Sequence, residues 1–232
     1  MYGDGLDPRL LRIISELKNE NLKEKVFDLV NNLWIYIGEE KFIGLSFDES
    51  PASRYRHHSY PGGLLEHTLS TIEIARTLCN SVEKIYRGQI DRDLVIAGVL
   101  LHDIMKPLTY EKTENGMCGI SPLGERLDHI TLAVTEMIRK EFSLEIVHIV
   151  AASHGESGFV RPRTIEALVC HLADIADSQL NEKVLGAARY LAKEICGETR
   201  QIMNAAIAFD IVKVKASEGW EGLRKMMNRR KK

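Results

Sequence analysis

The sequence predicts an all-α protein, a single-domain helical bundle, and three observations lead to that prediction. Apolar residues recur at spacings of three and four along most of the chain, as they do on the buried face of a helix. The stretches between these segments are rich in glycine and proline, which interrupt helices. No run of residues shows the alternation of a convincing strand, and there is no internal repeat or low-complexity linker.

The helical spacing places the individual helices. The expected helices cover residues 8–35 (in two runs), 64–80, 91–105, 125–141, 143–153, 163–181, 182–195 and 198–216. The first begins with Pro8 after Asp7, a cap residue followed by a proline suited to a first turn. Residues 36–63 should form a loop with at most one short helix. A second loop, at residues 107–124, is long enough to suggest a functional role such as a substrate wall.

We expect three parts along the chain. Residues 1–50 form an N-terminal helical extension packed on the core, residues 51–216 form the main domain, and residues 217–232 form a basic C-terminal tail. Six cations crowd the last nine residues, and we expect a solvated, frayed terminus there rather than a contact with a phosphate backbone. They are Arg224, Lys225, Arg229, Arg230, Lys231 and Lys232.

Composition narrows the class of protein. The chain of 232 residues is 44% hydrophobic and 28% charged, with a formal net charge of −2, which gives no general attraction to nucleic acid. No stretch resembles a secretory signal or reaches the length of a membrane span. The four cysteines form no CxxC pair, so we expect buried free thiols and a cytoplasmic protein. They are Cys79, Cys118, Cys170 and Cys196.

Histidines and aspartates stand out within the helical segments, at His67, His102, Asp103, His129, His154 and Asp174. A histidine in an apolar stripe, such as His67, is more often a core residue than a ligand. Asp103 ends a strongly apolar helix and is harder to explain, because a buried unpaired carboxylate costs several kcal/mol. Periodicity does not choose Asp174 over Asp177, and it does not exclude His171.

Taken together, these side chains predict a metal centre. Neutral imidazoles and carboxylates are ligands of Zn²⁺, iron, Mn²⁺ and similar ions. Six of them exceed the needs of one catalytic ion but fit two ions that share a carboxylate, which would be Asp103. Two adjacent ions activate water and stabilise both oxygens of a displacement at phosphorus.

The order His67, His102-Asp103, His129, His154, Asp174 resembles the HD-domain metal-dependent phosphohydrolase superfamily. The surrounding sequence is also similar, at residues 62–68 (GGLLEHT) and 97–106 (AGVLLHDIMK). It resembles most closely the HD domains of bacterial 3′–5′ exoribonucleases and their archaeal relatives, from about residue 50 to residue 185. The resemblance implies an all-α HD fold for residues 51–216. It selects Asp174 as the last ligand and suggests that Lys106 faces the substrate phosphate.

The resulting hypothesis is a metal-dependent phosphohydrolase that cleaves a phosphodiester or phosphomonoester of a nucleotide or short nucleic acid. His67, His102, Asp103 and Asp174 would hold one ion, and Asp103, His129 and His154 a second. The cofactor would be one or two divalent ions of Mn, Fe, Co, Ni or Zn, and a hydroxide bound to them would attack phosphorus. Asp103 and Lys106 are the expected catalytic residues, since an ammonium beside the ions neutralises a phosphoryl oxygen.

Two alternatives stay open: a nucleotidase acting on free nucleoside phosphates, and a nucleotide-binding module without catalysis. The exoribonucleases carry an OB-fold before the HD domain, whereas residues 1–50 here are predicted to be helical. Basic residues elsewhere could supply phosphate contacts, although we favour exposed basic loops for them. They are Arg54, Arg56, His57 and His58 in one loop and Arg161 and Arg163 in another.

Overall fold

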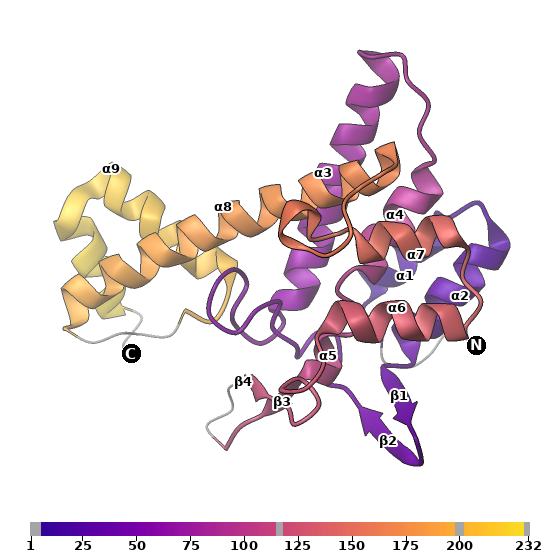
Figure 1. Cartoon of the computed structure of the whole chain (residues 1–232). Helices are drawn as coiled ribbons and strands as arrows, with labels where there is room; N and C mark the ends of the chain where they lie inside the picture. The colour runs from indigo at the N-terminus through magenta and orange to yellow at the C-terminus, as the bar shows by residue number, and fades with distance from the viewer. Residues whose placement is uncertain (1–5, 115–117, 198–201, 230–232) are drawn as a thin grey trace.

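The computed structural model describes residues 6–114, 118–197 and 202–229, and these are mostly helical (Figure 1). The helices are α1 (Pro8–Ser15), α2 (Glu20–Asn31), α3 (Gly63–Lys84), α4 (Arg92–Leu101), α5 (Lys106–Thr109), α6 (His129–Arg139), α7 (Leu144–Ala151), the short 3-10 helix η1 (Gly155–Ser157), α8 (Ile165–Cys196) and α9 (Ala205–Arg229). The strands are β1 (Trp34–Ile37), β2 (Glu40–Ile43), β3 (Tyr110–Lys112) and β4 (Cys118–Ile120). The predicted all-α class is confirmed.

The main core forms where α8 crosses α3 and α4, with α7 against α4 and α8 (Figure 1). Fully buried side chains such as Leu64, Ile72, Leu100 and Ile149 fill it. The same hydrophobic cluster continues into α1 and α2, through residues that include Leu10. The helices that carry the histidines and aspartates therefore belong to one packed body.

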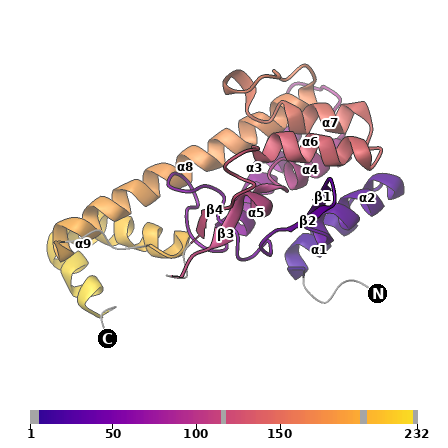
Figure 2. The same cartoon turned by 60° about the horizontal axis from the view of Figure 1, so that its bottom comes forward.

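A second, smaller cluster lies at the far end of α8. Leu185 and Ala192 of α8 pack there with Ile211 and Leu223 of α9. Figures 1 and 2 both show α9 folded against the end of α8, away from α1 and α2. The expectation of a frayed terminus is wrong for residues 224–229, since the helix continues to Arg229 after a break at Gly219 (φ 68°), and Leu223 and Met227 are buried. Arg230, Lys231 and Lys232 lie outside the described residues.

Two short antiparallel hairpins contradict the expectation that the chain has no strands. β1 pairs with β2, and β3 pairs with β4. Helix α2 ends at Asn31, so the predicted helix 8–35 extends too far and runs into β1. Strands of three or four residues are too short for an alternating pattern to stand out in the sequence. The predicted loop 107–124 contains β3 and β4, beginning directly after α5.

Several helix boundaries also differ from the predictions. The predicted helices 163–181 and 182–195 are one continuous helix, α8, and α6 begins at His129 rather than at residue 125. Asp128 caps α6 by accepting hydrogen bonds from the backbone N–H groups of Ile130 and Thr131. The predicted helix 198–216 begins outside the described residues, and its described helical part starts at Ala205.

Two further expectations can be compared with the described residues. None of the helices described is both long and apolar enough to cross a membrane. All four cysteines are free, with Cys79 and Cys170 buried and Cys118 and Cys196 half-buried.

Candidate metal centre

Four of the predicted ligands converge where α3, α4 and α8 meet. His67 comes from α3, His102 is the residue that caps the end of α4, Asp103 follows it, and Asp174 comes from α8. The first three are buried, and the side chain of Asp174 is 16% exposed. Four polar groups thus share a site that contains almost no solvent-exposed surface.

The distances between their atoms fit a shell around one ion. The Nε2 atom of His67 lies 3.2 Å from Nε2 of His102. It also lies 3.4 Å from Oδ2 of Asp103 and 3.3 Å from Oδ1 of Asp174. His102 Nε2 lies 3.3 Å and 3.8 Å from the same two oxygens. Ligands bound to one ion at about 2.0–2.2 Å are separated by roughly 3.0–3.5 Å, so these spacings suit a common cation.

The hydrogen bonds behind the two imidazoles leave both Nε2 atoms facing the centre. His102 Nδ1 lies 2.8 Å from the carbonyl oxygen of Val99, and His67 Nδ1 lies 2.6 Å from Oδ2 of Asp177. Carbonyl and carboxylate oxygens only accept, so each Nδ1 carries a proton. The Nε2 lone pairs then face each other and two carboxylates, an arrangement that is repulsive without a positive charge.

The pKa values of His102 and Asp103 are shifted by the charges around them. Burial alone would lower the pKa of His102, but the charges of Asp103 and Asp174 outweigh it and raise the pKa to about 9. Burial would raise the pKa of Asp103, but His102 and Lys106 hold it well below its usual range. Protons therefore take the place of a cation when no cation is bound.

Two buried atoms at the centre lack well-formed hydrogen bonds. They are Oδ2 of Asp103 and Nε2 of His129. Lys106 Nζ lies 2.6 Å from the first, as an ion pair, and Lys106 is itself 9% exposed. Orphaned acceptors are rare in protein interiors and call for a specific explanation. One divalent cation beside Oδ2 of Asp103 and a second beside Nε2 of His129 would satisfy these two atoms, and the donor set suits such ions.

The other two predicted ligands lie on the opposite side of Asp103. His129 begins α6, and its Nε2 is 3.2 Å from Oδ1 of Asp103. His154 follows α7, and the centroid of its ring is 5.2 Å from that of His129. His154 is exposed, unlike the first four residues. The two oxygens of Asp103 therefore face different groups of imidazoles.

The two residues that periodicity left open as alternatives have other contacts. His171 Nδ1 lies 2.7 Å from the carbonyl oxygen of Ser153, so this ring supports the turn that carries His154. Gly155 occupies that turn with φ 54°, and a Cβ there would lie 2.1 Å from the His171 ring. Asp177 contacts His67 from the side opposite Asp174.

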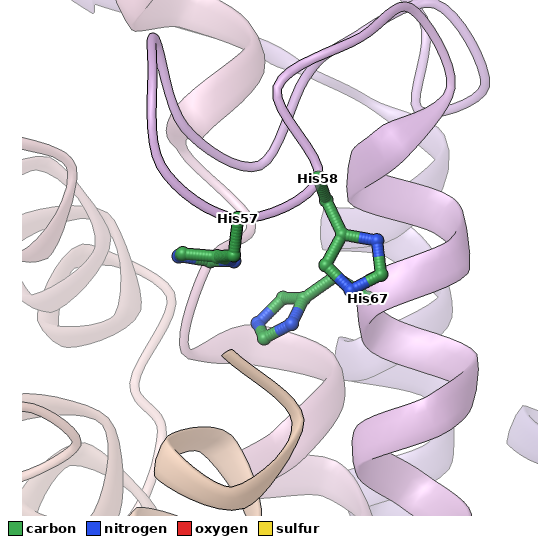
Figure 3. Close-up of side chains that lie close together, drawn as sticks. All are labelled: His57, His58 and His67. Carbon is green, nitrogen blue, oxygen red and sulfur yellow. The ribbon is translucent and has the colours of Figure 1, made fainter. Parts of the chain in front are cut away.

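The sequence did not predict that His57 and His58 lie beside the metal centre. The expectation of an exposed basic loop is wrong for both residues. His58 is 3% exposed and His57 is half-buried. Figure 3 shows both rings extending from the loop before α3 toward the ring of His67. The centroid of the His57 ring is 5.0 Å from that of His67. Adjacent histidines directly before the Gly62-Gly63 turn were the available signal.

The remaining loop residues fit the expectation. Arg54, Arg56, Arg161 and Arg163 are exposed. Arg56 lies 3.5 Å from Glu182, and Arg161 lies 3.1 Å from Glu156. Their pairing with surface carboxylates gives no evidence of a phosphate site.

His57, His58 and His67 could also form a set of three ligands, because their ring nitrogens lie within 4.8 Å of one another (Figure 3). However, His58 Nε2 and His67 Nδ1 both contact Oδ2 of Asp177, at 2.9 Å and 2.6 Å. Those nitrogens are already bonded, so the set around His67, His102 and Asp174 is the better metal site.

A model of the HD domain family matches residues 64–178, a range that contains all six predicted ligands. A dihydroneopterin 2′,3′-cyclic phosphate phosphodiesterase of Methanocaldococcus jannaschii is 36% identical over 211 residues, which cover 91% of this chain and 84% of that protein. The chain belongs to the HD-domain family. No solved structure matches it.

A second HD-domain relative is less similar. The 3′-5′ exoribonuclease YhaM of Bacillus licheniformis is 30% identical over 179 residues, which cover 72% of this chain but only 52% of the exoribonuclease. The exoribonuclease is the kind of protein that the sequence motifs resemble, and the predicted HD-domain family is confirmed. Membership confirms the prediction of an HD-type, metal-dependent phosphohydrolase.

Proposed function

We propose that this protein is a phosphodiesterase that opens a small cyclic phosphodiester, of the kind named for the Methanocaldococcus relative. The observation that carries the proposal is the extent of the similarity, which includes nearly the whole of both chains. The match to the exoribonuclease leaves about half of that protein uncovered. A cyclic phosphodiester, as named for the Methanocaldococcus relative, is therefore favoured over a long RNA as the substrate.

The centre described above fits the metal that this chemistry needs. His67, His102, Asp103 and Asp174 would hold one ion, and Asp103, His129 and His154 would hold a second. A divalent ion there would lower the pKa of a bound water toward neutrality and draw charge from the phosphoryl oxygens. The identity of the metal stays open between Mn, Fe, Co, Ni and Zn, because imidazole and carboxylate suit all of them.

Lys106 has a proposed role in catalysis. Its ammonium contacts Oδ2 of Asp103 at 2.6 Å and is largely buried, so it carries a positive charge to the edge of the centre. An ammonium in that place stabilises the negative charge that grows on the phosphoryl oxygens during attack. Asp103 fixes both this ammonium and the imidazoles on its two sides.

The proposed reaction has a simple balance. Water adds to phosphorus, one ring P–O bond breaks, and the leaving oxygen takes a proton. The product is a phosphomonoester with a free hydroxyl group. Because Lys106 and both histidine groups surround Asp103, the phosphate would lie over that carboxylate.

A substrate panel tests the proposal. The purified protein, supplied in turn with Mn²⁺, Fe²⁺ or Co²⁺, is given dihydroneopterin 2′,3′-cyclic phosphate, 2′,3′-cyclic nucleotides, a labelled RNA oligomer and free nucleoside phosphates. We expect turnover of the cyclic phosphodiesters and little of the others. Shortening of the RNA from its 3′ end with no ring opening would favour the exoribonuclease relative instead.

Two other outcomes correspond to the remaining alternatives. Release of phosphate from nucleoside mono- or triphosphates alone would indicate a nucleotidase. Tight binding of a nucleotide without any product would indicate a non-catalytic module, although HD modules that lack catalysis typically lose ligands and this chain retains all six. A cytoplasmic location stays a prediction.

A further inference from the structure

We infer that His58 and Asp177 form a positioning pair that holds the imidazole of His67 in the orientation and tautomer needed for the metal centre. The inference rests on the proposed metal centre, but it concerns residues that the six-ligand motif does not include. Asp177 lies on α8, one turn after Asp174, and His58 lies in the loop before α3.

The contacts of Asp177 carry the first step. Its Oδ2 lies 2.6 Å from Nδ1 of His67 and 2.9 Å from Nε2 of His58. The three side chains are at most 4% exposed. A buried carboxylate with no partner is costly, and here two ring N–H groups satisfy it. Asp174 and Asp177 thus contact the two nitrogens of His67 from opposite sides.

His58 has no free nitrogen with which to bind a metal itself. Its Nδ1 lies 3.0 Å from the hydroxyl of Tyr60, which donates to Oε2 of Glu66 at 2.7 Å. Its Nε2 is the atom that contacts Asp177. Both edges of the ring are therefore used within the protein, so His58 acts on the centre only through Asp177.

The backbone at His58 adds a second, independent observation. Its φ is 44°, in the left-handed region that residues other than glycine rarely adopt. Its N–H donates to Oδ1 of Asn181 at 2.6 Å. Its carbonyl oxygen lies so close to α3 that a Cβ at Gly63 would be 2.0 Å away. A strained conformation of this kind persists only where surrounding contacts hold it. Here it places the imidazole of His58 next to Asp177.

Carboxylates behind metal-binding histidines fix the ring and raise its basicity. Loss of such a partner typically weakens metal affinity by about 10- to 100-fold. His102 obtains the equivalent support from the carbonyl of Val99. Of the two imidazoles on this ion, only His67 has its Nδ1 atom held by a side chain, that of Asp177. Mutation of Asp177 can remove this hydrogen bond without altering any ligand.

The test measures metal affinity in the absence of substrate. The full-length chain is stripped of metal, and Zn²⁺ binding is measured by competition with a fluorescent chelator. Asp177→Asn keeps the side-chain shape but removes the charge, and we expect affinity about 10- to 100-fold weaker than that of the unaltered chain. Glu182→Gln is the matched control, since it removes a carboxylate of α8 that contacts Arg56 at the surface. It should leave the affinity unchanged.

His58→Asn provides the second variant, because asparagine tolerates the left-handed backbone but cannot reach Asp177. We expect a smaller loss of affinity than with Asp177→Asn. Nitrogen-15 NMR of the His67 ring in the Zn²⁺-loaded protein gives a readout that a purely structural role would not move. In the unaltered chain the proton should reside on Nδ1, and its resonance should lie at low field because it donates to the Asp177 carboxylate. In Asp177→Asn this resonance should move away from low field.

The inference is overturned if Asp177→Asn binds Zn²⁺ as tightly as the unaltered chain. It is also overturned if either variant merely lowers the melting temperature of the metal-free protein while its affinity stays the same. If Asp177→Asn does not fold, unchanged affinity in His58→Asn overturns the inference and weaker affinity supports it. Weaker affinity together with inactivity of the unaltered enzyme on every phosphodiester would overturn the proposed function alone.

Discussion

The two sides of Asp103 differ in how firmly the protein defines them. The closed side consists of Oδ2 of Asp103 with His67, His102 and Asp174. The open side consists of Oδ1 of Asp103 with His129 and His154. On the closed side the imidazoles are buried and oriented by hydrogen bonds to Val99 and Asp177. On the open side His154 is exposed, and Nε2 of His129 has no well-formed hydrogen bond.

This difference indicates a division of labour within one centre. Preorganised ligands bind an ion tightly because little has to be ordered on binding. We therefore expect the closed side to retain its ion through purification and the open side to exchange its ion with solvent. The open side is also where a substrate can approach.

Removal of a closed-side ligand should have the largest effect. In His102→Ala the buried carboxylates lose a partner and the ion loses a ligand. Because metal ions supply several kcal/mol of transition-state stabilisation, we expect kcat/KM for the cyclic phosphodiester to fall about 1000-fold or more. Metal content should fall with it. Retained activity with one ion fewer would show that the closed side is not essential.

Lys106 should rank next, because in the proposed mechanism it stabilises charge without holding the ion. Loss of one group of this kind typically costs about 10²- to 10³-fold in kcat, and we expect that loss in Lys106→Ala. Lys106→Arg keeps the charge and should recover part of the rate. A fall in metal content rather than in rate would instead assign Lys106 to the structure of the centre.

Open-side variants should be milder and should depend on the metal concentration. We expect His129→Ala and His154→Ala to lower activity about 10- to 100-fold at limiting metal, with recovery when Mn²⁺ is in excess. Steady-state rates measured across a metal titration would check this. Activity losses as deep as that of His102→Ala, with no recovery, would erase the distinction between the two sides.

The pH should change metal binding at the closed side. The pKa of His102 is about 9 when no cation is bound, so the ring carries a proton that a metal must displace. Burial alone would lower the pKa of His67, but hydrogen bonds to Asp103 and Asp174 outweigh it and raise that pKa as well. Apparent affinity should therefore rise by about tenfold or more per pH unit between pH 7 and 9. Chelator competition across this range provides the measurement, and a flat profile from pH 7 to 9 would contradict the assignment.

Removal of metal should lower thermal stability by a modest amount. An ion present at about 100 times its dissociation constant contributes about 2.7 kcal/mol, which corresponds to roughly 5–11 °C in Tm for a chain of this size. His154→Ala should retain this shift and His102→Ala should lose it. An unchanged Tm of His154→Ala after chelation would contradict the assignment, because an ion that binds only the folded state must stabilise it.

Much of the fold and the centre could be predicted from the sequence. Long apolar periodicity located α3 and α4 and covered α8 as two separate helices. The order of histidines and aspartates selected residues that lie together in the structure. The hairpins could not be predicted, because β1 to β4 have only three or four residues each. The helical end of the chain was also missed, since Leu223 and Met227 bury against α8 while exposed cations dominate the composition.

The role of His58 could not be predicted because it depends on tertiary contacts. A basic loop reads as exposed, and nothing local reveals that Asp177, far away on α8, accepts from its ring. Periodicity presented Asp174 and Asp177 as competitors for one role. In the structure they flank the same imidazole, His67, from its two sides.

Anomalous diffraction from crystals of the purified protein, with elemental analysis of the same sample, tests directly whether two ions bind beside Asp103. We expect a strong peak among Nε2 of His67, Nε2 of His102, Oδ2 of Asp103 and Oδ1 of Asp174. We expect a weaker peak, which strengthens when metal is added, between Asp103 and His129. A single peak among His57, His58 and His67, or no peak beside Asp103 at any metal concentration, would contradict this expectation.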